Sequence, residues 1–280
     1  MNNQSKSQPI LVLGGTGKTG RRIAQRLADA GVPVRIGSRS AVPPFDWQNP
    51  ATWPSALDGM SAAYISYQPD LAVHGAVEAV RSFAERALSK GVDRLVLLSG
   101  RGEEEAQLAE EALKASGADW TILRASWFQQ NFSESFLLDA VLGGMIALPV
   151  GDIGEPFIDV DDIADVAVAA LTETGHGGQL YELTGPRLLT FAEATAEIAR
   201  ASGQRLSFQQ VTPEQYAGAL EQAGLPGDVL ALVMYLFTTV LDGRNAHVTD
   251  GVRRALGREP RDFTDYAKDV ADAGVWGMPT

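Results

Sequence analysis

The stretch ILVLGGTGKTG, residues 10–20, decides the fold, and the helical run Arg21–Ala30 follows it. Its four leading apolar residues predict a buried strand, and the glycines behind them predict a turn that opens a helix. This helix is expected to bury Ile23, Leu27 and Ala28. In such a turn the first glycine allows a tight bend, the second lets a pyrophosphate approach the backbone, and the third lets helix and strand pack closely. A bound anion would lie on the free amides and the positive dipole end of the helix.

The glycine spacing of this turn has two possible explanations. Glycine is common in the chain, with 29 among 280 residues, so the turn could merely join a strand to a helix. Its position directly after the first strand favours dinucleotide binding instead. A nucleoside triphosphate loop would need a glycine five residues before Gly17, where Val12 stands. We therefore expect the pyrophosphate to be held by Gly14, Gly15, Thr16, Gly17, Lys18, Thr19 and Gly20.

Composition describes an acidic chain that is long enough to bury a full core. The 280 residues are 45% hydrophobic and carry a net charge of -12, which disfavours nucleic acids and anionic membranes as partners. There is no cysteine, which excludes disulfides and thiolate metal ligands. The polar start Met1–Gln8 lacks a secretory pattern, so a cytoplasmic location is expected. The longest apolar run, Val229–Phe237, is too short to span a bilayer and predicts a buried helix.

The segment after the second predicted strand, Val32–Ile36, indicates which dinucleotide is bound. NAD would require a carboxylate about 20 residues past the glycine turn, to accept hydrogen bonds from the ribose hydroxyls. No acidic residue lies between Arg35 and Val42, whereas Arg39 stands between Ser38 and Ser40. These three side chains suit a 2′-phosphate, so NADP(H) is expected. A solvated loop cation is the alternative explanation of Arg39.

The residues after this segment, Pro43–Trp47, could form a third strand. Asp46 would then accept a hydrogen bond at the adenine edge, with Trp47 beside it. A surface-loop acid explains Asp46 equally well.

Strands and helices alternate along the first half of the chain. Further strands are predicted at Ala62–Ser66, Leu95–Leu98, Trp120–Leu123 and Leu180–Leu183. This alternation predicts an α/β fold with a doubly wound parallel sheet of the Rossmann type. Ligands bind at the carboxyl ends of such strands, which singles out Ser66, Tyr67, Ser99, Gly100, Arg101, Trp127 and Asn131. Residues 1–136, completed by about 157–184, are expected to form the dinucleotide-binding core. Residues 137–156 and 185–280 would form a smaller substrate-binding portion.

A helix predicted to open at Glu103–Glu105 bears on the chemistry. Its acids are expected to form a solvated cap at the positive dipole end, and Leu108, Ala112 and Leu113 to form its apolar face. Short-chain reductases protonate the developing alkoxide with a tyrosine that is followed four residues later by a lysine. None of the six tyrosines has such a lysine, and Ala106 and Glu110 occupy plausible equivalent positions in this helix. Ordinary alcohol dehydrogenation is therefore disfavoured.

Other polar clusters are explained best as helix starts. Asp159, Asp161 and Asp162 precede or begin a helix with no histidine nearby, so capping is expected rather than metal binding. Thr190 with Glu193 and Thr212 with Gln215 are typical of helix starts. Asp228 is expected to cap the apolar helix that follows Pro226.

Taken together, these features resemble the NmrA-like family of atypical short-chain dehydrogenases/reductases. The resemblance rests on Leu13–Gly20, Ser38–Ser40, Leu97–Ser99, Ser116–Gly117 before Trp120–Arg124, Asn131 and Phe157–Ala164. Phe45–Trp47 and Ser99–Gly102 are similar to the agroclavine and festuclavine dehydrogenase group of ergot alkaloid reductases. The resemblance implies NADP(H) at the glycine turn and a small C-terminal substrate portion. Relatives often carry Pro-Gly after the arginine of the sixth strand, where this chain has Ala125–Ser126.

Two functions are open at this point. The first is an NADPH-dependent reductase of a small cyclic or aromatic acceptor of the iminium, quinone or azo type. An iminium carbon already carries the positive charge that protonation would otherwise provide. Ser66 would contact the cofactor, and Tyr67, Ser99, Trp127 and Asn131 would line the nicotinamide and substrate; packing roles explain these four equally well. The second, which the resemblance implies, is a redox-sensing regulator that binds NADP(H) without turnover. In either case we expect a small-molecule ligand and a monomer or homodimer.

Overall fold

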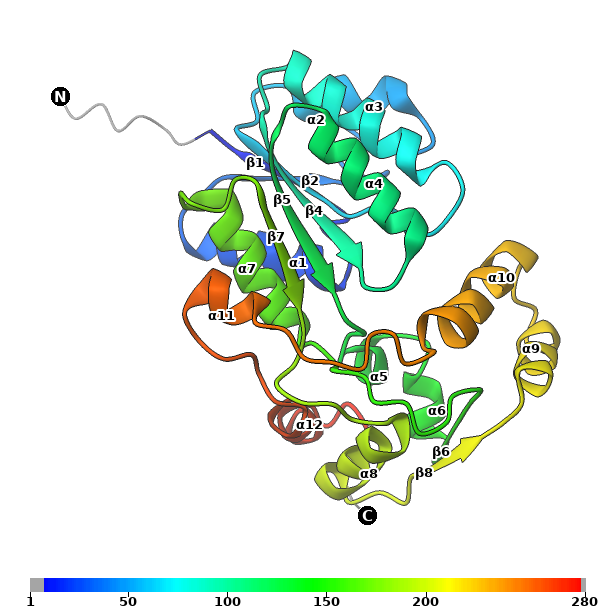
Figure 1. Ribbon diagram of the computed structural model, residues 1–280. Coiled ribbons are helices and arrows are strands. Elements are labelled where there is room, and N and C mark those ends of the chain that lie inside the picture. The colour runs from blue at the N-terminus through cyan, green and yellow to red at the C-terminus, as the bar shows by residue number, and fades with distance from the viewer. Residues whose placement is uncertain (1–7, 278–280) are drawn as a thin grey trace. The chain divides into compact units, whose positions relative to one another are not determined.

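The computed structural model describes residues 8–277 and divides into two compact units (Figure 1). Unit 1 holds the described part of Met1–Arg124 together with Ile163–Tyr181 and Arg254–Gly257. Unit 2 holds Ala125–Asp162, Glu182–Arg253 and the described part of Arg258–Thr280. No helix within residues 8–277 is long and apolar enough to cross a membrane.

A mostly parallel six-stranded sheet runs in the order β2-β1-β3-β4-β5-β7. Its strands are β2 (Val34–Gly37), β1 (Ile10–Leu13), β3 (Ala62–Ile65), β4 (Arg94–Gly100), β5 (Asp119–Ala125) and β7 (Gln179–Leu183). Ile10 pairs with Val34 on one side and with Ala62 on the other, both in parallel register. The strands that follow β1 therefore lie on both sides of it in the sheet, and the predicted doubly wound fold is confirmed.

The possible strand at Pro43–Trp47 is wrong. These residues form a loop in which the Phe45 amide donates to the Ser38 carbonyl at 2.9 Å and the Asp46 amide donates to Thr52 Oγ1 at 3.0 Å. Two consecutive prolines also lack the amides that a strand ladder requires. The short helices η1 (Pro50–Thr52) and α2 (Trp53–Leu57) follow this loop.

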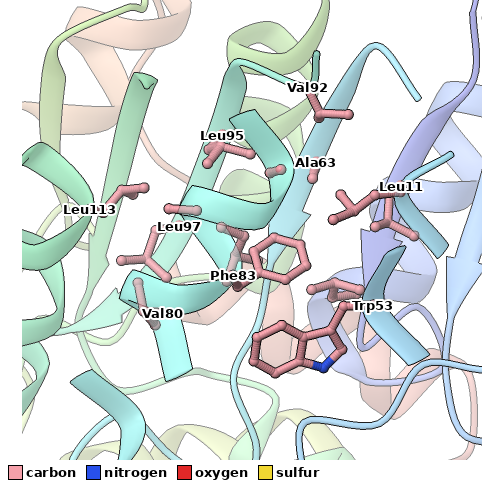
Figure 2. Packing of buried hydrophobic residues seen from close by; sticks show 14 of the residues in the cluster. Leu11, Trp53, Ala63, Val80, Phe83, Val92, Leu95, Leu97 and Leu113 are labelled. Carbon is pink, nitrogen blue, oxygen red and sulfur yellow. The ribbon is translucent and has the colours of Figure 1, made fainter. Parts of the chain in front are cut away.

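Helices cover both faces of the sheet in unit 1 (Figure 1). On one face α2, α3 (Ala76–Ser89) and α4 (Glu104–Ala115) pack on alternate strand residues. Figure 2 shows Leu11, Ala63 and Leu97 of the strands packed against Trp53, Val80 and Phe83 of these helices. On the other face lie α1 (Lys18–Asp29) and α7 (Val160–Thr172), which are joined by an Arg26–Asp165 ion pair of 2.7 Å.

Two predicted helix faces require correction. In α1, Ile23 and Leu27 are buried as predicted, but Ala28 is exposed. In α4, Leu108 is 58% exposed, and the buried face instead carries Ala106, Ala109, Glu110, Ala112 and Leu113. Alanines on this face let α4 pack closely against α3, so small residues rather than the larger Leu108 turn inward. Glu103 is also buried, so the predicted solvated cap is wrong for this residue.

Unit 2 is built mainly from short helices around an aromatic core. Its elements are α5 (Asn131–Glu134), α6 (Leu138–Leu142), β6 (Met145–Leu148), α8 (Phe191–Ser202), β8 (Ser207–Gln210), α9 (Pro213–Gln222), α10 (Gly227–Tyr235), the π-helix η2 (Leu236–Val240) and α12 (Phe263–Asp272). The helix α11 (Gly251–Leu256) begins in this unit. Strands β6 and β8 pair in parallel. The core includes Phe132, Phe157, Phe191, Phe237, Phe263, Tyr266 and Trp276.

The predicted helix starts mostly agree with the structure. Thr190 with Glu193 and Thr212 with Gln215 form reciprocal capping boxes, and Asp159 Oδ1 accepts the Asp161 amide at 2.8 Å in front of α7. Asp228 does not cap α10, because it lies in the first turn of that helix behind Pro226. The helix predicted at Val229–Phe237 forms, as α10 followed by η2, but its predicted burial is wrong. α10 has no buried residue, and burial begins at Phe237 in η2.

Candidate functional site

The glycine turn after β1 has the geometry of a phosphate cradle. Gly14 adopts a left-handed conformation with φ of 64°, which side chains rarely tolerate. A Cβ on Gly20 would lie 2.2 Å from the Gly14 carbonyl oxygen, so helix and turn touch through bare backbone. Gly17 precedes α1 without a side-chain cap, so the first turn of the helix lacks the usual side-chain acceptor, as in helix starts that bind anions. These features fit a dinucleotide pyrophosphate.

The side chain and the backbone amide of Thr19 have different roles. Its hydroxyl is buried and accepts a hydrogen bond from Tyr64 Oη at 3.0 Å. Burial raises the pKa of Tyr64 well above its ordinary value, so this phenol remains a donor. The Thr19 side chain therefore supports the turn from the core, and its amide is the group that could contact a phosphate.

The end of β2 lies directly beside the glycine turn. The Gly14 amide donates to the Gly37 carbonyl at 3.2 Å, and the Ser38 and Ser40 hydroxyls are 3.3 Å apart. Arg35 Nη1 donates to the carbonyls of residues 55, 56 and 58, so this cation anchors α2. Arg39 is exposed, and within residues 8–277 it makes no hydrogen bond or ion pair. Arg39 is therefore the cation of this segment that remains available to a 2′-phosphate.

The loop 43–49 lies against the end of β3. Trp47 Nε1 donates to the Ser66 carbonyl at 3.1 Å, and its ring lies 5.0 Å from that of Tyr67. The Asp46 carboxylate accepts the Gln48 amide at 3.0 Å within its own turn. Ser66 in turn lies against the glycine turn, since a Cβ on Gly14 would be 3.3 Å from its Cβ and Oγ. The structure thus brings together four predicted site residues: Gly14, Trp47, Ser66 and Tyr67.

Tyr67 is half-buried at this carboxyl edge of the sheet. Burial raises the pKa of its phenol, which keeps the proton on the oxygen. Among the residues that the structure describes, no side chain or carbonyl forms a hydrogen bond with the Tyr67 hydroxyl. Tyr67 therefore presents an unused proton donor.

Ser99 belongs to a closed polar network instead. Its hydroxyl donates to Glu110 Oε1 at 2.7 Å, and Arg124 binds the same carboxylate through Nε at 2.9 Å and through Nη2. Glu110 is fully buried. Because the Ser99 proton points at Glu110, Ser99 could offer a ligand only an acceptor.

The pairing of Glu110 was not predicted, although the sequence carries a signal for it. Glu110 follows Ala106 and precedes Leu113 at helical spacing, so it lies on the buried face of α4. An acid at such a position must be paired, which would have directed attention to an arginine near the strand ends.

Trp127 and Asn131 lie in unit 2, so the four predicted catalytic residues are not gathered within one unit. The Trp127 amide donates to Glu155 Oε1 at 3.2 Å, and its ring lies 4.9 Å from that of Phe237 and 5.7 Å from that of Phe191. Asn131 opens α5 and is half-buried. Trp127 thus forms part of an aromatic surface with one side in the core of unit 2.

The aspartates before and within α7 are paired with cations. Asp159 Oδ2 lies 3.1 Å from Arg261 Nη1, and Asp162 Oδ1 lies 2.6 Å from Arg258 Nη1. Gln130 completes the arrangement, because its amide nitrogen donates to Asp159 and its oxygen accepts the Val160 amide. These ion pairs and hydrogen bonds explain the aspartates as groups that stabilise the start of α7.

Comparisons with known proteins agree with the α/β fold. The agroclavine dehydrogenase of Claviceps fusiformis is 32% identical, covering 96% of this chain and 99% of the relative. The structure also resembles an NADPH-dependent quinone oxidoreductase from Escherichia coli, with a TM-score of 0.79 at 20% identity over 93% of this chain and 99% of the other. The negative transcriptional regulator NmrA, solved in complex with NAD, gives a TM-score of 0.72 at 18% identity over 96% and 97%. The family model described as NAD(P)H-binding matches residues 14–174, more than half of the chain. The predicted resemblance is thereby confirmed, and the chain belongs to the NAD(P)H-binding family, whose relatives here include named NAD(P)H oxidoreductases.

Proposed function

We propose that the protein is an NADPH-dependent reductase of a small cyclic or aromatic acceptor of the iminium, quinone or azo type. The observation that carries the choice of cofactor is the exposed, unpaired Arg39 beside the hydroxyls of Ser38 and Ser40. No carboxylate accompanies them at the end of β2, where NAD would need one.

Residues of unit 1 would hold the cofactor. The turn Gly14–Gly17 and the first amides of α1, from Lys18 to Gly20, would bind the pyrophosphate. Trp47 and Asp46 would lie at the adenine side, and Ser66 and Tyr67 at the nicotinamide. When bound, the dinucleotide supplies a hydride.

The polar residues of the site offer few groups that could protonate the acceptor during hydride transfer. Ala106 and Glu110 occupy the positions of a tyrosine and lysine pair; the first is buried in the core, and the second is engaged by Ser99 and Arg124. Tyr67 is the hydroxyl left for protonation. Hydride addition to the carbon of an iminium ion gives a neutral amine and requires no proton. An iminium acceptor therefore suits this arrangement best.

The test is steady-state oxidation of NADPH against cyclic iminium salts, quinones and azo dyes, followed by the loss of nicotinamide absorbance. Turnover should be fastest with the iminium salts, and Tyr67→Phe should slow quinones and azo dyes more than iminium salts. Tight NADPH binding without turnover on all three classes would contradict the reductase and support the redox-sensing regulator. Sedimentation of the same samples would show whether the protein is a monomer or a homodimer.

A further inference from the structure

A surface pocket of unit 2 has no part in the function proposed above. It has a volume of about 520 Å³, which is within the range of small-molecule sites. Three segments line it: residues 185–186 after β7, residues 248–250 with 253 at the start of α11, and residues 259–260 after that helix. All of these residues belong to unit 2.

Close backbone contacts hold the lining segments in place. A Cβ on Gly251 would lie 2.0 Å from the Glu182 carbonyl oxygen, so the start of α11 rests directly on β7. A Cβ on Gly185 would lie 2.2 Å from the Phe157 carbonyl oxygen, and the Gly185 amide donates to the Pro156 carbonyl at 3.0 Å. The walls of the pocket are therefore fixed by backbone packing.

The hydrogen-bond donors of this wall are used within the protein. The Thr249 amide donates to Thr184 Oγ1 at 3.0 Å, and the Thr249 hydroxyl donates to the Glu182 carbonyl at 2.6 Å. The Gly185 amide is likewise engaged, and the prolines at positions 186 and 260 have no amide hydrogen. None of these four lining residues has a free donor for a ligand.

The charged groups of the pocket favour a cation. Asp250 is exposed, and within residues 8–277 its carboxylate makes no hydrogen bond or ion pair. Arg253 Nη1 lies 3.4 Å from Glu259 Oε1, so the lining arginine already faces a second carboxylate. Two acids and one arginine leave one negative charge unbalanced. Because a carboxylate only accepts hydrogen bonds, a matching ligand brings both positive charge and donors.

A buried acceptor without a donor lies behind the same wall. Gln129 is fully buried, and its Nε2 donates at 3.1 Å to the Phe157 carbonyl, the oxygen on which Gly185 lies. In the part of the chain that the structure describes, Gln129 Oε1 is the buried side-chain oxygen that has no hydrogen-bond partner. The shortage of donors thus extends to the layer beneath the pocket.

We propose that this pocket binds a small organic ammonium ion, with the charged group at Asp250 and the hydrocarbon part against Val248 and the two prolines. Val248 is apolar but 49% exposed, and a bound hydrocarbon would cover it. A metal ion fits less well, because the described residues contain no group of three acids or histidines that could hold one. The cyclic amine released by an iminium reductase is protonated at neutral pH and belongs to the proposed class. That link rests on the proposed function, whereas the preference for a cation does not.

The first experiment is calorimetric titration of the full chain, without cofactor and at low salt, with three ring compounds of similar size. Cyclohexylammonium is the cation, cyclohexanol the neutral compound and cyclohexanecarboxylate the anion. The protein should bind the cation most tightly and the carboxylate least. Equal affinity for all three, tightest binding of the carboxylate, or no binding of any of them would overturn the proposal.

Asp250→Asn tests whether the cation binds in this pocket. The variant keeps the size of the side chain and removes its charge. The affinity for cyclohexylammonium should therefore fall about fivefold, the upper end of the range for an exposed ion pair. Asp228→Asn is the matched control, because Asp228 is also exposed in unit 2 but does not line the pocket. An unchanged affinity in Asp250→Asn, or an equal loss in both variants, would overturn the site.

NADPH turnover on the acceptor panel separates the pocket from the proposed function. Cyclohexylammonium binding that depends on Asp250, together with no turnover by the wild type on any acceptor, would count against the proposed function and leave the pocket standing. Turnover by the wild type, together with cyclohexylammonium binding that both variants retain in full, would do the reverse.

Discussion

The loops after β1 and β2 differ from the last residues of β4 and β5 in how their polar groups are used. After β1 and β2, a helix begins without a side-chain cap and Arg39 is exposed without a partner among residues 8–277. At the ends of β4 and β5, Ser99 and Arg124 converge on the fully buried Glu110. Both regions lie at the edge of one sheet.

The difference separates the surface that we propose to bind the cofactor from a network that supports the fold. Unused donors at a strand end remain solvated until an acceptor arrives, whereas a satisfied buried network fixes the backbone around it. Substitutions in the open region should therefore change cofactor binding, and substitutions in the closed region should change stability.

Glu110→Ala should give the largest effect. It removes the acceptor of Ser99 and leaves Arg124, which is 17% exposed, without its carboxylate. Breaking such a pair costs about 3 kcal/mol, at the lower end of the range for buried pairs because solvent reaches the arginine. The free energy of unfolding in urea measures this loss. Glu111→Ala, next in the sequence but exposed and paired only at the surface, should cost less than about 0.5 kcal/mol. Equal costs would mean that the network does not support the fold.

Gly20→Ala should give the next largest effect and should lower both stability and NADPH affinity. The new Cβ would have to displace the Gly14 carbonyl oxygen, which stands 2.2 Å away, so α1 must separate from the turn. Such overpacking costs about 1 to 3 kcal/mol of stability. NADPH affinity should fall by more than the stability loss alone explains, because the first helical amides move. The control is Gly218→Ala in α9, where no atom lies within 4 Å and helix propensity predicts a small gain of about 0.5 to 1 kcal/mol.

Arg39→Ala should weaken NADPH binding alone. Loss of a charge-assisted contact to the 2′-phosphate should cost about 1.5 to 3 kcal/mol, while NADH affinity and stability stay nearly unchanged. Calorimetric titration with both dinucleotides measures the difference. Arg86→Ala on the exposed side of α3 is the control for a general change in charge. An equal loss for NADPH and NADH would show that Arg39 does not recognise the phosphate.

These contrasts also explain which features could be predicted from the sequence. The glycine turn, most of the strands and the capping boxes at Thr190 and Thr212 depend on neighbours within a few residues, so their patterns are local. The position of Ser38–Ser40 is local for the same reason, because the segment follows a strand at a fixed distance from the turn; its phosphate-binding role stays a prediction.

The rest depends on partners that are distant in the chain. The spacing of α4 shows that Glu110 lies on a buried face and must be paired, but it does not show that the partners are Ser99 and Arg124, which are 11 and 14 residues away. The apolar run of α10 predicted burial, but the helix has no buried residue, because burial requires surrounding elements that its own sequence does not reveal. The same limit applies to the proposed catalytic residues. Tyr67 and Ser99 are predicted only from their positions near strand ends. In the structure the Ser99 hydroxyl donates to Glu110, whereas the Tyr67 hydroxyl has no partner among the described residues.

Trp47→Phe should give the smallest effect and tests the border between the two kinds of region. The indole bond to the Ser66 carbonyl is lost, which costs about 1 kcal/mol of stability, while a phenyl ring still fills the aromatic cluster around Phe45 and Tyr67. If Trp47 lies at the adenine side, NADPH affinity should fall a few-fold as well. Trp53→Phe is the matched variant, because its indole likewise donates to a carbonyl, that of Asp46 at 2.8 Å, but its ring is 3% exposed and cannot meet a ligand. Its loss should be confined to stability. Should the two variants bind NADPH equally well, Trp47 would belong with the supporting network, and the open region would end at Ser66.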